Sequence, residues 1–297
     1  MRTPSGVFRG RFWFKPILPL QYAAHFTVRQ AHVQPILNIA VRAARSAGAM
    51  IVRQLDRVDA LNVTSKGRND FVSEVDQRAE QIIIETIRKV YPDHGILAEE
   101  SGAQGDDEFV WIIDPLDGTT NFLHNFPHFG VSIALQHKSQ ILHGVVFDPL
   151  RQELFTASRG DGAQLNDRKI RVSRKTELDG ALLGTGFPFR EIADVDQYLA
   201  TLSAFMPLCA GIRRAGSAAL DLAYVAAGRL DGFWEFGLER WDIAAGALLI
   251  QEAGGLVSDP LGGEDYLKMG NIVVGNAKIT KIMLKTLHPI LTSRDKT

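Results

Sequence analysis

The sequence predicts an α+β fold, and three observations support this class. Apolar residues recur at helical spacing before and after the central part of the chain, first between residues 36 and 51. Short apolar runs typical of strands lie between these segments. The runs at 131–136 and 141–147 are separated only by a short polar turn, so we expect a hairpin. Hairpins flanked by helices indicate a mixed arrangement rather than a simple doubly wound parallel sheet.

The helices are expected where an apolar period of 3.6 coincides with residues that begin or end helices. They lie at 36–51, 75–90, 218–227 and 243–253. Pro35 suits the first turn of the first helix, and Pro92 ends the second. Gly228 and Gly254 follow the last two helices at the position where glycine commonly ends a helix.

The strands are expected in short runs of apolar and β-branched residues. They lie at 109–113, 131–136, 141–147, 152–157, 169–173 and 272–274. Pro115 predicts that the first of these strands stops at Ile113, because proline cannot donate a hydrogen bond to a sheet.

Composition excludes several classes of protein. The 297 residues include 33 Lys or Arg and 34 Asp or Glu, so the basic excess of a protein built mainly to hold nucleic acid is missing. Cys209 is the only cysteine, which rules out an internal disulfide. No apolar run approaches the ~20 residues that a membrane-spanning helix needs. We therefore expect a cytoplasmic protein without a membrane association.

The first 32 residues differ from the rest of the chain. They are basic, and the first acidic residue of the sequence is Asp56. A basic leader without acids is also typical of an organellar transit peptide, but this segment lacks a clean amphipathic period. We expect a disordered extension at 1–32, followed by one catalytic domain at 33–297.

The strongest chemical signal is the string WIIDPLDGTTNF at 111–122. An apolar strand delivers Asp114 at its tip, and Asp117, Gly118 and Thr119 follow. Paired carboxylates bind hard cations, and free N–H groups after a glycine turn bind phosphate oxygens. A simple turn with a threonine helix cap would explain only part of the string. The string therefore predicts a site for metal and phosphate.

Two further acidic segments could complete this site. Glu99 and Glu100 follow the apolar pair Ile96-Leu97 at the end of an expected strand, although adjacent glutamates also occur in solvated loops. Asp242 precedes an apolar helix and is predicted as its N-cap, and a carboxylate at that position can also point toward a metal.

Other types of catalytic site are not supported. The sequence contains no HExxH pair, no GxSxG string and no Walker sequence. Phosphatases with an aspartate nucleophile carry it two residues before the second Asp, and Pro115 occupies that position here. Water activated by a metal remains as the nucleophile.

Taken in order, Glu99-Glu100-Ser101, the string at 111–122, and Trp241-Asp242 with its following helix resemble the inositol monophosphatase family. The resemblance extends from about residue 35 to about residue 290 and is closest to the bacterial inositol-1-monophosphatase branch. It implies a layered α-β-α-β-α sandwich, dependence on Mg²⁺, sensitivity to lithium and a homodimer.

The resemblance also implies a role for each matching residue. The metal ligands would be Glu99, Asp114, the carbonyl of Leu116, Asp117 and Asp242. The catalytic residues would be Glu99, Asp114 and Thr119, with Asp76 behind Thr119 to position the attacking water. The substrate contacts would be Glu99, Asp117, Gly118, Thr119, Gly216, Ser217, Ala218, Glu235 and Asp242. The implied reaction is Mg²⁺-dependent release of phosphate from a myo-inositol monophosphate.

Two alternative functions stay open. A nucleotide 3′-phosphatase or a sugar bisphosphatase shares the metal motifs, and Arg213 and Arg214 are the residues that could bind a second phosphate. Bacterial members of the family are also associated with ribosomal RNA transcription complexes, so an additional association with RNA or with such a complex is the second alternative. The sequence itself contains no RNA-binding motif.

Overall fold

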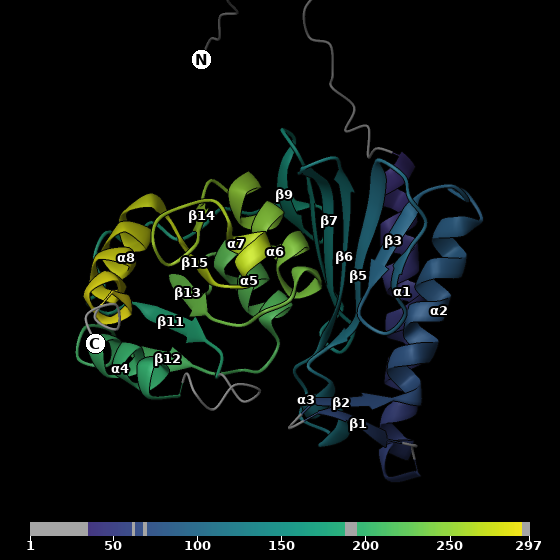
Figure 1. The fold of residues 1–297 in the computed structure, drawn as a ribbon, viewed down its shortest axis with the longest axis horizontal. Helices are drawn as coiled ribbons and strands as arrows, with labels where there is room; N and C mark the ends of the chain where they lie inside the picture. The colour runs from purple at the N-terminus through teal and green to yellow at the C-terminus, as the bar shows by residue number, and fades with distance from the viewer. Residues whose placement is uncertain (1–34, 61–62, 68–69, 188–194, 293–297) are drawn as a thin grey trace, which may run out of the picture. The chain divides into compact units, whose positions relative to one another are not determined.

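The computed structural model describes residues 35–60, 63–67, 70–187 and 195–292, with side chains omitted for 59–72. The expected extension at 1–32 lies outside these residues. The described elements belong to one compact unit, residues 34–297, and alternate between helical layers and sheets (Figure 1). The α+β class and the α-β-α-β-α layering predicted from the sequence are confirmed.

The first sheet has eight strands in the order β10-β9-β8-β7-β6-β5-β3-β4. Their bounds are β3 Gly95–Ala98, β4 Gly102–Gln104, β5 Phe109–Asp117, β6 Gly130–His137, β7 Gln140–Asp148, β8 Glu153–Ser158, β9 Gly162–Leu165 and β10 Arg168–Lys169. All neighbours pair antiparallel except β3 and β5, which are parallel. The parallel pair brings the carboxyl ends of β3 and β5 to the same edge of the sheet, so Glu99 and Asp114 emerge close together.

Helices cover both faces of this sheet. One face carries α1 (Pro35–Gln54) and α2 (Glu74–Arg88), and the other carries α5 (Ala218–Ala226) and α6 (Arg240–Glu252) (Figure 1). Helix α6 lies directly on strand β7, because a Cβ on Gly144 would come within 3.0 Å of the Ala245 carbonyl oxygen. A side chain at Gly144 would therefore push the helix away from the sheet.

The second sheet has five strands in the order β12-β11-β13-β15-β14. Their bounds are β11 Leu182–Thr185, β12 Gly211–Arg213, β13 Gly232–Glu235, β14 Leu256–Ser258 and β15 Ile272–Gly275. Helices α5 and α6 separate it from the first sheet, and α4 (Val195–Phe205) and α8 (Ala277–Leu291) form the outer layer (Figure 1). The remaining elements are a 3-10 helix at Leu55–Ala60, the hairpin β1 (Val63–Gly67) and β2 (Asp70–Ser73), α3 (Thr119–Leu123) and α7 (Tyr266–Met269).

The structure corrects three predictions about element bounds. The first is the end of the strand at Ile113, since β5 continues through Pro115 to Asp117. The pairing of β5 with β6 becomes irregular between Asp114 and Asp117, and such a bulge leaves a position where no ladder N–H is needed. Proline is therefore tolerated inside the strand.

The second correction concerns the strand expected at 169–173. Only Arg168 and Lys169 pair in the sheet, as β10. Beyond them the backbone is held by other contacts: the N–H of Val172 donates to the Ala253 carbonyl, and the Asn276 amide donates to the Ser173 carbonyl. Individual hydrogen bonds replace a strand ladder in this segment.

The third correction concerns Asp242. Helix α6 begins at Arg240 with Glu239 as N-cap, so Asp242 is the third residue of the helix and not its cap. Its carboxylate accepts a hydrogen bond of 2.8 Å from the Glu239 backbone N–H. The side chain therefore does stabilise the helix start, but from inside the first turn.

None of the helices in the described residues is both long enough and apolar enough to cross a membrane.

Candidate active site

A cavity of about 820 Å³ brings the predicted site residues together. It is lined by Glu99, Asp114, Leu116, Asp117, Gly118, Thr119, Gly216, Ser217, Ala218, Glu235 and Asp242. These are all the residues that the sequence assigned to metal and substrate. Asp76 does not line the cavity and reaches it through Thr119.

Three carboxylates form the acidic centre of the cavity. Oxygens of Asp114, Asp117 and Asp242 lie within 4.8 Å of one another. Asp114 and Asp117 come from strand β5, whereas Asp242 comes from the first turn of α6. The bulge at the end of β5 is what lets two aspartates three residues apart face the same point.

The acidic centre is electrostatically costly when no cation compensates it. Burial, followed by the negative charges of Glu99, Asp117 and Asp242, raises the pKa of Asp114 well above its ordinary value. Burial also raises the pKa of Asp117, although hydrogen bonds from Ser217 and from backbone N–H groups act in the opposite direction. A divalent cation would relieve this repulsion, and a set of oxygen donors is what Mg²⁺ prefers. The residues therefore fit a hard divalent cation.

Asp117 is held rigidly by the start of helix α5. The Ser217 hydroxyl donates to Asp117 Oδ2 at 2.6 Å, and the Ala219 N–H donates to the same oxygen at 2.7 Å. The other oxygen, Oδ1, takes part in neither contact. One carboxylate thus joins the end of β5 to α5.

Thr119 and Asp76 form a hydrogen-bonded pair beside the acidic centre. The Thr119 hydroxyl lies 2.9 Å from Asp76 Oδ1 and 3.0 Å from the Leu116 carbonyl oxygen. Asp76 Oδ2 accepts from the Ser73 N–H at 2.9 Å and from the Ser73 hydroxyl at 2.6 Å. Asp76 is 1% exposed, and burial raises its pKa. The pair can hold a water molecule in one orientation.

Glu99 is positioned by a residue that the sequence did not single out. Glu80 on α2 is 3% exposed, and its two carboxylate oxygens accept from the N–H groups of Glu100 and Ser101, at 2.8 and 2.9 Å. Helix α2 therefore fixes the backbone of the segment that carries Glu99. The sequence signal was weak, since an acidic residue on a helix is usually solvated.

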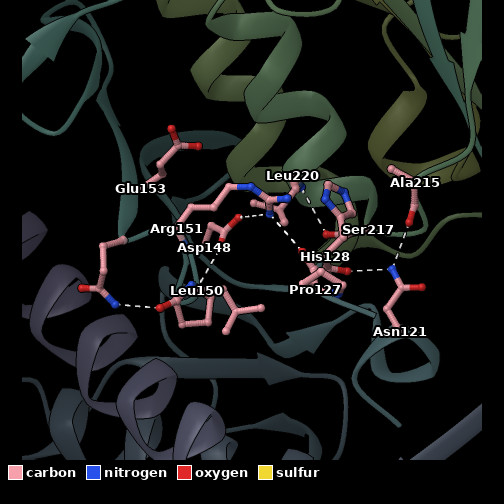
Figure 2. Close-up of polar contacts among 12 residues, drawn as sticks. Asn121, Pro127, His128, Asp148, Leu150, Arg151, Glu153, Ala215, Ser217 and Leu220 are labelled. Carbon is pink, nitrogen blue, oxygen red and sulfur yellow. Dashed lines mark hydrogen bonds and ion pairs between the residues drawn. The ribbon is translucent and has the colours of Figure 1, made fainter. Parts of the chain in front are cut away.

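The turn at Gly118 depends on the absence of a side chain. Gly118 has φ of 93°, and a Cβ there would lie 3.1 Å from both the Gly216 and the His128 carbonyl oxygens. The Asn121 amide crosses the same junction and donates to the His128 and Ala215 carbonyls at 2.6 and 2.9 Å (Figure 2). These contacts fix the Gly216 turn beside the turn that precedes α3.

The cavity is also lined by two further carboxyl groups, those of Glu235 and Asp221. Burial raises the pKa of both carboxyl groups well above their ordinary values, and the Arg214 guanidinium lowers both. Asp221 was missed by the sequence reasoning. Its one distinguishing signal is that it is the only charged residue in the apolar run at 218–227.

Of the two arginines considered for a second phosphate, Arg214 lines the cavity and Arg213 does not. Arg214 stacks over Phe187, with its guanidinium carbon 5.2 Å from the ring centroid. Its positive charge also lowers the pKa values of Asp117, Asp221 and Glu235 against the effect of burial. The structure thus places an arginine in the cavity, but among carboxylates.

Comparison with known proteins agrees with this geometry. The inositol monophosphatase family model matches residues 32–292. A relative from Pseudomonas aeruginosa strain PAO1, named Nus factor SuhB, is 57% identical over 265 residues, which cover 87% of this chain and 98% of that protein. The crystal structure of the extragenic suppressor protein suhB from Bartonella henselae has a TM-score of 0.83 at 47% identity, and the match covers 85% of this chain and 98% of that one. An inositol monophosphatase from Anabaena has a TM-score of 0.78 at 41% identity, covering 87% and 97%.

Proposed function

Because the chain belongs to the inositol monophosphatase family, we propose that it releases phosphate from myo-inositol monophosphates in a reaction that depends on Mg²⁺. The observation that carries this proposal is the cluster of Asp114, Asp117 and Asp242 in a cavity that Glu235 also lines. The cluster suits a cation and a phosphate, and the Glu235 carboxyl group suits the hydroxyls of a polyol. The name of the related Anabaena protein supports the same substrate.

The carboxylates of Glu99, Asp114, Asp117 and Asp242, with the Leu116 carbonyl, would hold the metal. Bound Mg²⁺ would supply charge neutralisation at the phosphate and a lowered pKa for water. The Thr119 hydroxyl donates its hydrogen to Asp76, so its oxygen accepts a hydrogen bond from the attacking water in a fixed orientation. The N–H groups of Gly118 and Thr119 at the start of α3 orient the phosphate. Attack by water then releases free phosphate and the alcohol.

The experiment that tests this proposal measures free phosphate from three substrates at saturating Mg²⁺. They are inositol 1-phosphate, adenosine 3′,5′-bisphosphate and fructose 1,6-bisphosphate. We expect the highest kcat/KM with inositol 1-phosphate, loss of activity with EDTA, recovery with added Mg²⁺ and inhibition by lithium. A higher kcat/KM with either bisphosphate would replace the proposal by a nucleotide 3′-phosphatase or a sugar bisphosphatase. Full activity after exhaustive chelation would refute the metal-dependent reaction.

A matched pair of variants ties the activity to the cavity. Asp114→Asn removes a charge from the acidic centre and should abolish most of the turnover. Asp148→Asn changes another fully buried aspartate, which pairs with Arg151 outside the cavity (Figure 2). We expect Asp148→Asn to lower the melting temperature and leave kcat/KM nearly unchanged.

A second function is favoured by the names of the relatives. The Pseudomonas relative is named Nus factor, and we propose that this chain also associates with ribosomal RNA transcription complexes. Affinity purification of the full-length chain from lysate, with mass spectrometry of the captured proteins, tests the association. The Asp114→Asn variant should capture the same partners if assembly is independent of catalysis. Absence of RNA polymerase subunits and RNA from the captured material would refute it.

We also propose that the chain forms a homodimer in the cytoplasm. Light scattering after size-exclusion chromatography would give the mass of a dimer, and the mass of a single chain would refute this.

A further inference from the structure

We infer that Asp221 is a second polyol-recognition residue, which acts beside Glu235 to select substrates with ring hydroxyls and a single phosphate. This inference deepens the proposed function and rests on it.

The first observation is the position of the Asp221 carboxyl group. It lies on α5, one turn after the Ser217 N-cap, and lines the cavity although the residue is only 2% exposed. Among the described residues, no side chain or backbone N–H donates a hydrogen bond to this carboxyl group, whereas the Asp117 carboxylate, at the end of β5, accepts one from the Ser217 hydroxyl and one from the Ala219 N–H. Buried carboxyl groups are normally hydrogen-bonded. A hydroxyl group of a bound ligand would supply the missing donor.

The second observation is a pair of glycines beneath the two carboxyl groups. Gly184 and Gly186 are two residues apart at the end of β11, in the second sheet. A Cβ on Gly186 would overlap Glu235 Oε1, at 1.6 Å. A Cβ on Gly184 would lie 2.9–3.0 Å from Leu230 and Phe233 and only in ordinary contact, 3.9 Å, with Asp221 Cγ. Residues two apart in extended backbone face the same side. The missing side chain of Gly186 therefore leaves the room that the Glu235 carboxyl group occupies. The contact of Gly184 with Asp221 places the second carboxyl group on the same wall.

The third observation is the charge balance of this wall. Ionisation of Asp221 makes ionisation of Glu235 less favourable, because the Asp221 charge contributes to the raised pKa of Glu235. Arg214 is the cation that acts on both. The Arg214 guanidinium therefore interacts with two carboxyl groups of the cavity, and its positive charge is not reserved for a second phosphate. The hydroxyl groups of a ligand can instead donate hydrogen bonds to both Asp221 and Glu235. The wall therefore favours a polyol and disfavours a bisphosphate.

The test compares three substrates in the wild-type holoenzyme and in two variants, Asp221→Leu and Asp221→Asn. Asp221→Leu removes every hydrogen bond that the side chain at this position can make. The kcat/KM for inositol 1-phosphate should fall about 10- to 150-fold, the range for a hydrogen bond to a charged group, mainly through KM. Phenyl phosphate has no ring hydroxyl and so makes no hydrogen bond to this residue. Its kcat/KM should therefore change less than about 3-fold.

Asp221→Asn keeps the size and polarity of the residue and removes its ability to ionise. The ratio of kcat/KM for fructose 1,6-bisphosphate to that for inositol 1-phosphate should rise, because a residue that cannot ionise does not repel the second phosphate. Asp148→Asn serves as the control for a buried aspartate outside the cavity, and its ratio should match the wild type.

The outcomes separate this inference from the proposed function. Equal losses on inositol 1-phosphate and phenyl phosphate, or no loss on either, would overturn the role of Asp221 while the wild-type activity stands. A wild-type enzyme that does not hydrolyse inositol 1-phosphate would instead refute the proposed function. If Asp221→Leu fails to fold, the substrate ratio of Asp221→Asn decides, and an unchanged ratio overturns the inference.

Discussion

Glu80 offers a sharp test of how the cavity is positioned, because its side chain is buried and binds only backbone. Its two oxygens accept from the N–H groups of Glu100 and Ser101. Glu80→Gln keeps the shape but turns one oxygen into an NH₂ group, which then faces an N–H donor. A hydrogen bond to a charged group contributes about 1.5–3 kcal/mol, and an orphaned buried donor costs about 1–3 kcal/mol. We expect the free energy of unfolding to fall by about 2–4 kcal/mol.

For a domain of this size, that loss corresponds to a decrease in melting temperature of about 5–15 °C. The assay is thermal unfolding followed by circular dichroism at pH 7, with Glu85→Gln as the control. Glu85 lies on the same helix but is exposed, so its change should stay within about 0.5 kcal/mol. The Mg²⁺ concentration for half-maximal phosphatase activity should also rise in Glu80→Gln, because the backbone that carries Glu99 is less fixed. Equal melting temperatures for the two variants would refute this account of Glu80.

Three further predictions follow from the structure and the sequence. Asp242→Asn keeps an oxygen that accepts from the Glu239 N–H at the start of α6 but removes a charge from the acidic centre. The melting temperature should therefore stay the same while turnover falls strongly. Near-normal turnover would limit Asp242 to stabilising the helix start. Burial lowers the pKa of His128 to about 4, which is below its unfolded value of 6.5. The folded state therefore favours the neutral ring. This contribution to stability is complete above pH 6.5 and is lost as the pH falls toward 4. His128→Phe should therefore lose less stability than the wild type on acidification, by up to about 3 kcal/mol in urea unfolding, and parallel pH profiles would contradict this. Deletion of residues 1–32 should leave both phosphatase activity and melting temperature nearly unchanged, and a large loss of either would make the segment part of the fold.

The long periodic elements of the fold could be predicted, and the short ones could not. Helices α1, α2 and α5 and the hairpin of β6 and β7 match their sequence patterns closely. In the second sheet only β15 was predicted, at 272–274. The other four strands also have only three or four residues, which is too few for an alternating pattern to develop. Helix α8 was also missed, although Asn276 caps it through its side chain. Its Pro289 and scattered charged residues obscured the period.

The residues of the candidate site also fall into two groups, those that could be predicted and those that could not. Residues within contiguous motifs, such as Asp114 and Asp117, could be identified because strand and turn signals surround them. Asp221 and Glu80 are single acidic residues on helices, and only tertiary packing buries them. The register of Asp242 depended on where α6 begins, and a shift of the cap by three residues changed its structural role.

The starts of α2 and α6 share a feature that bears on the entropy of catalysis. In both helices the third residue is an aspartate whose Oδ2 accepts from the N–H of the N-cap residue: Asp76 from Ser73, and Asp242 from Glu239. Each carboxylate is therefore restricted to one rotamer as soon as its helix forms. The conformational freedom of these two side chains is lost during folding, so binding of a substrate does not have to remove it. Local helix formation thus orders part of the reacting geometry in advance.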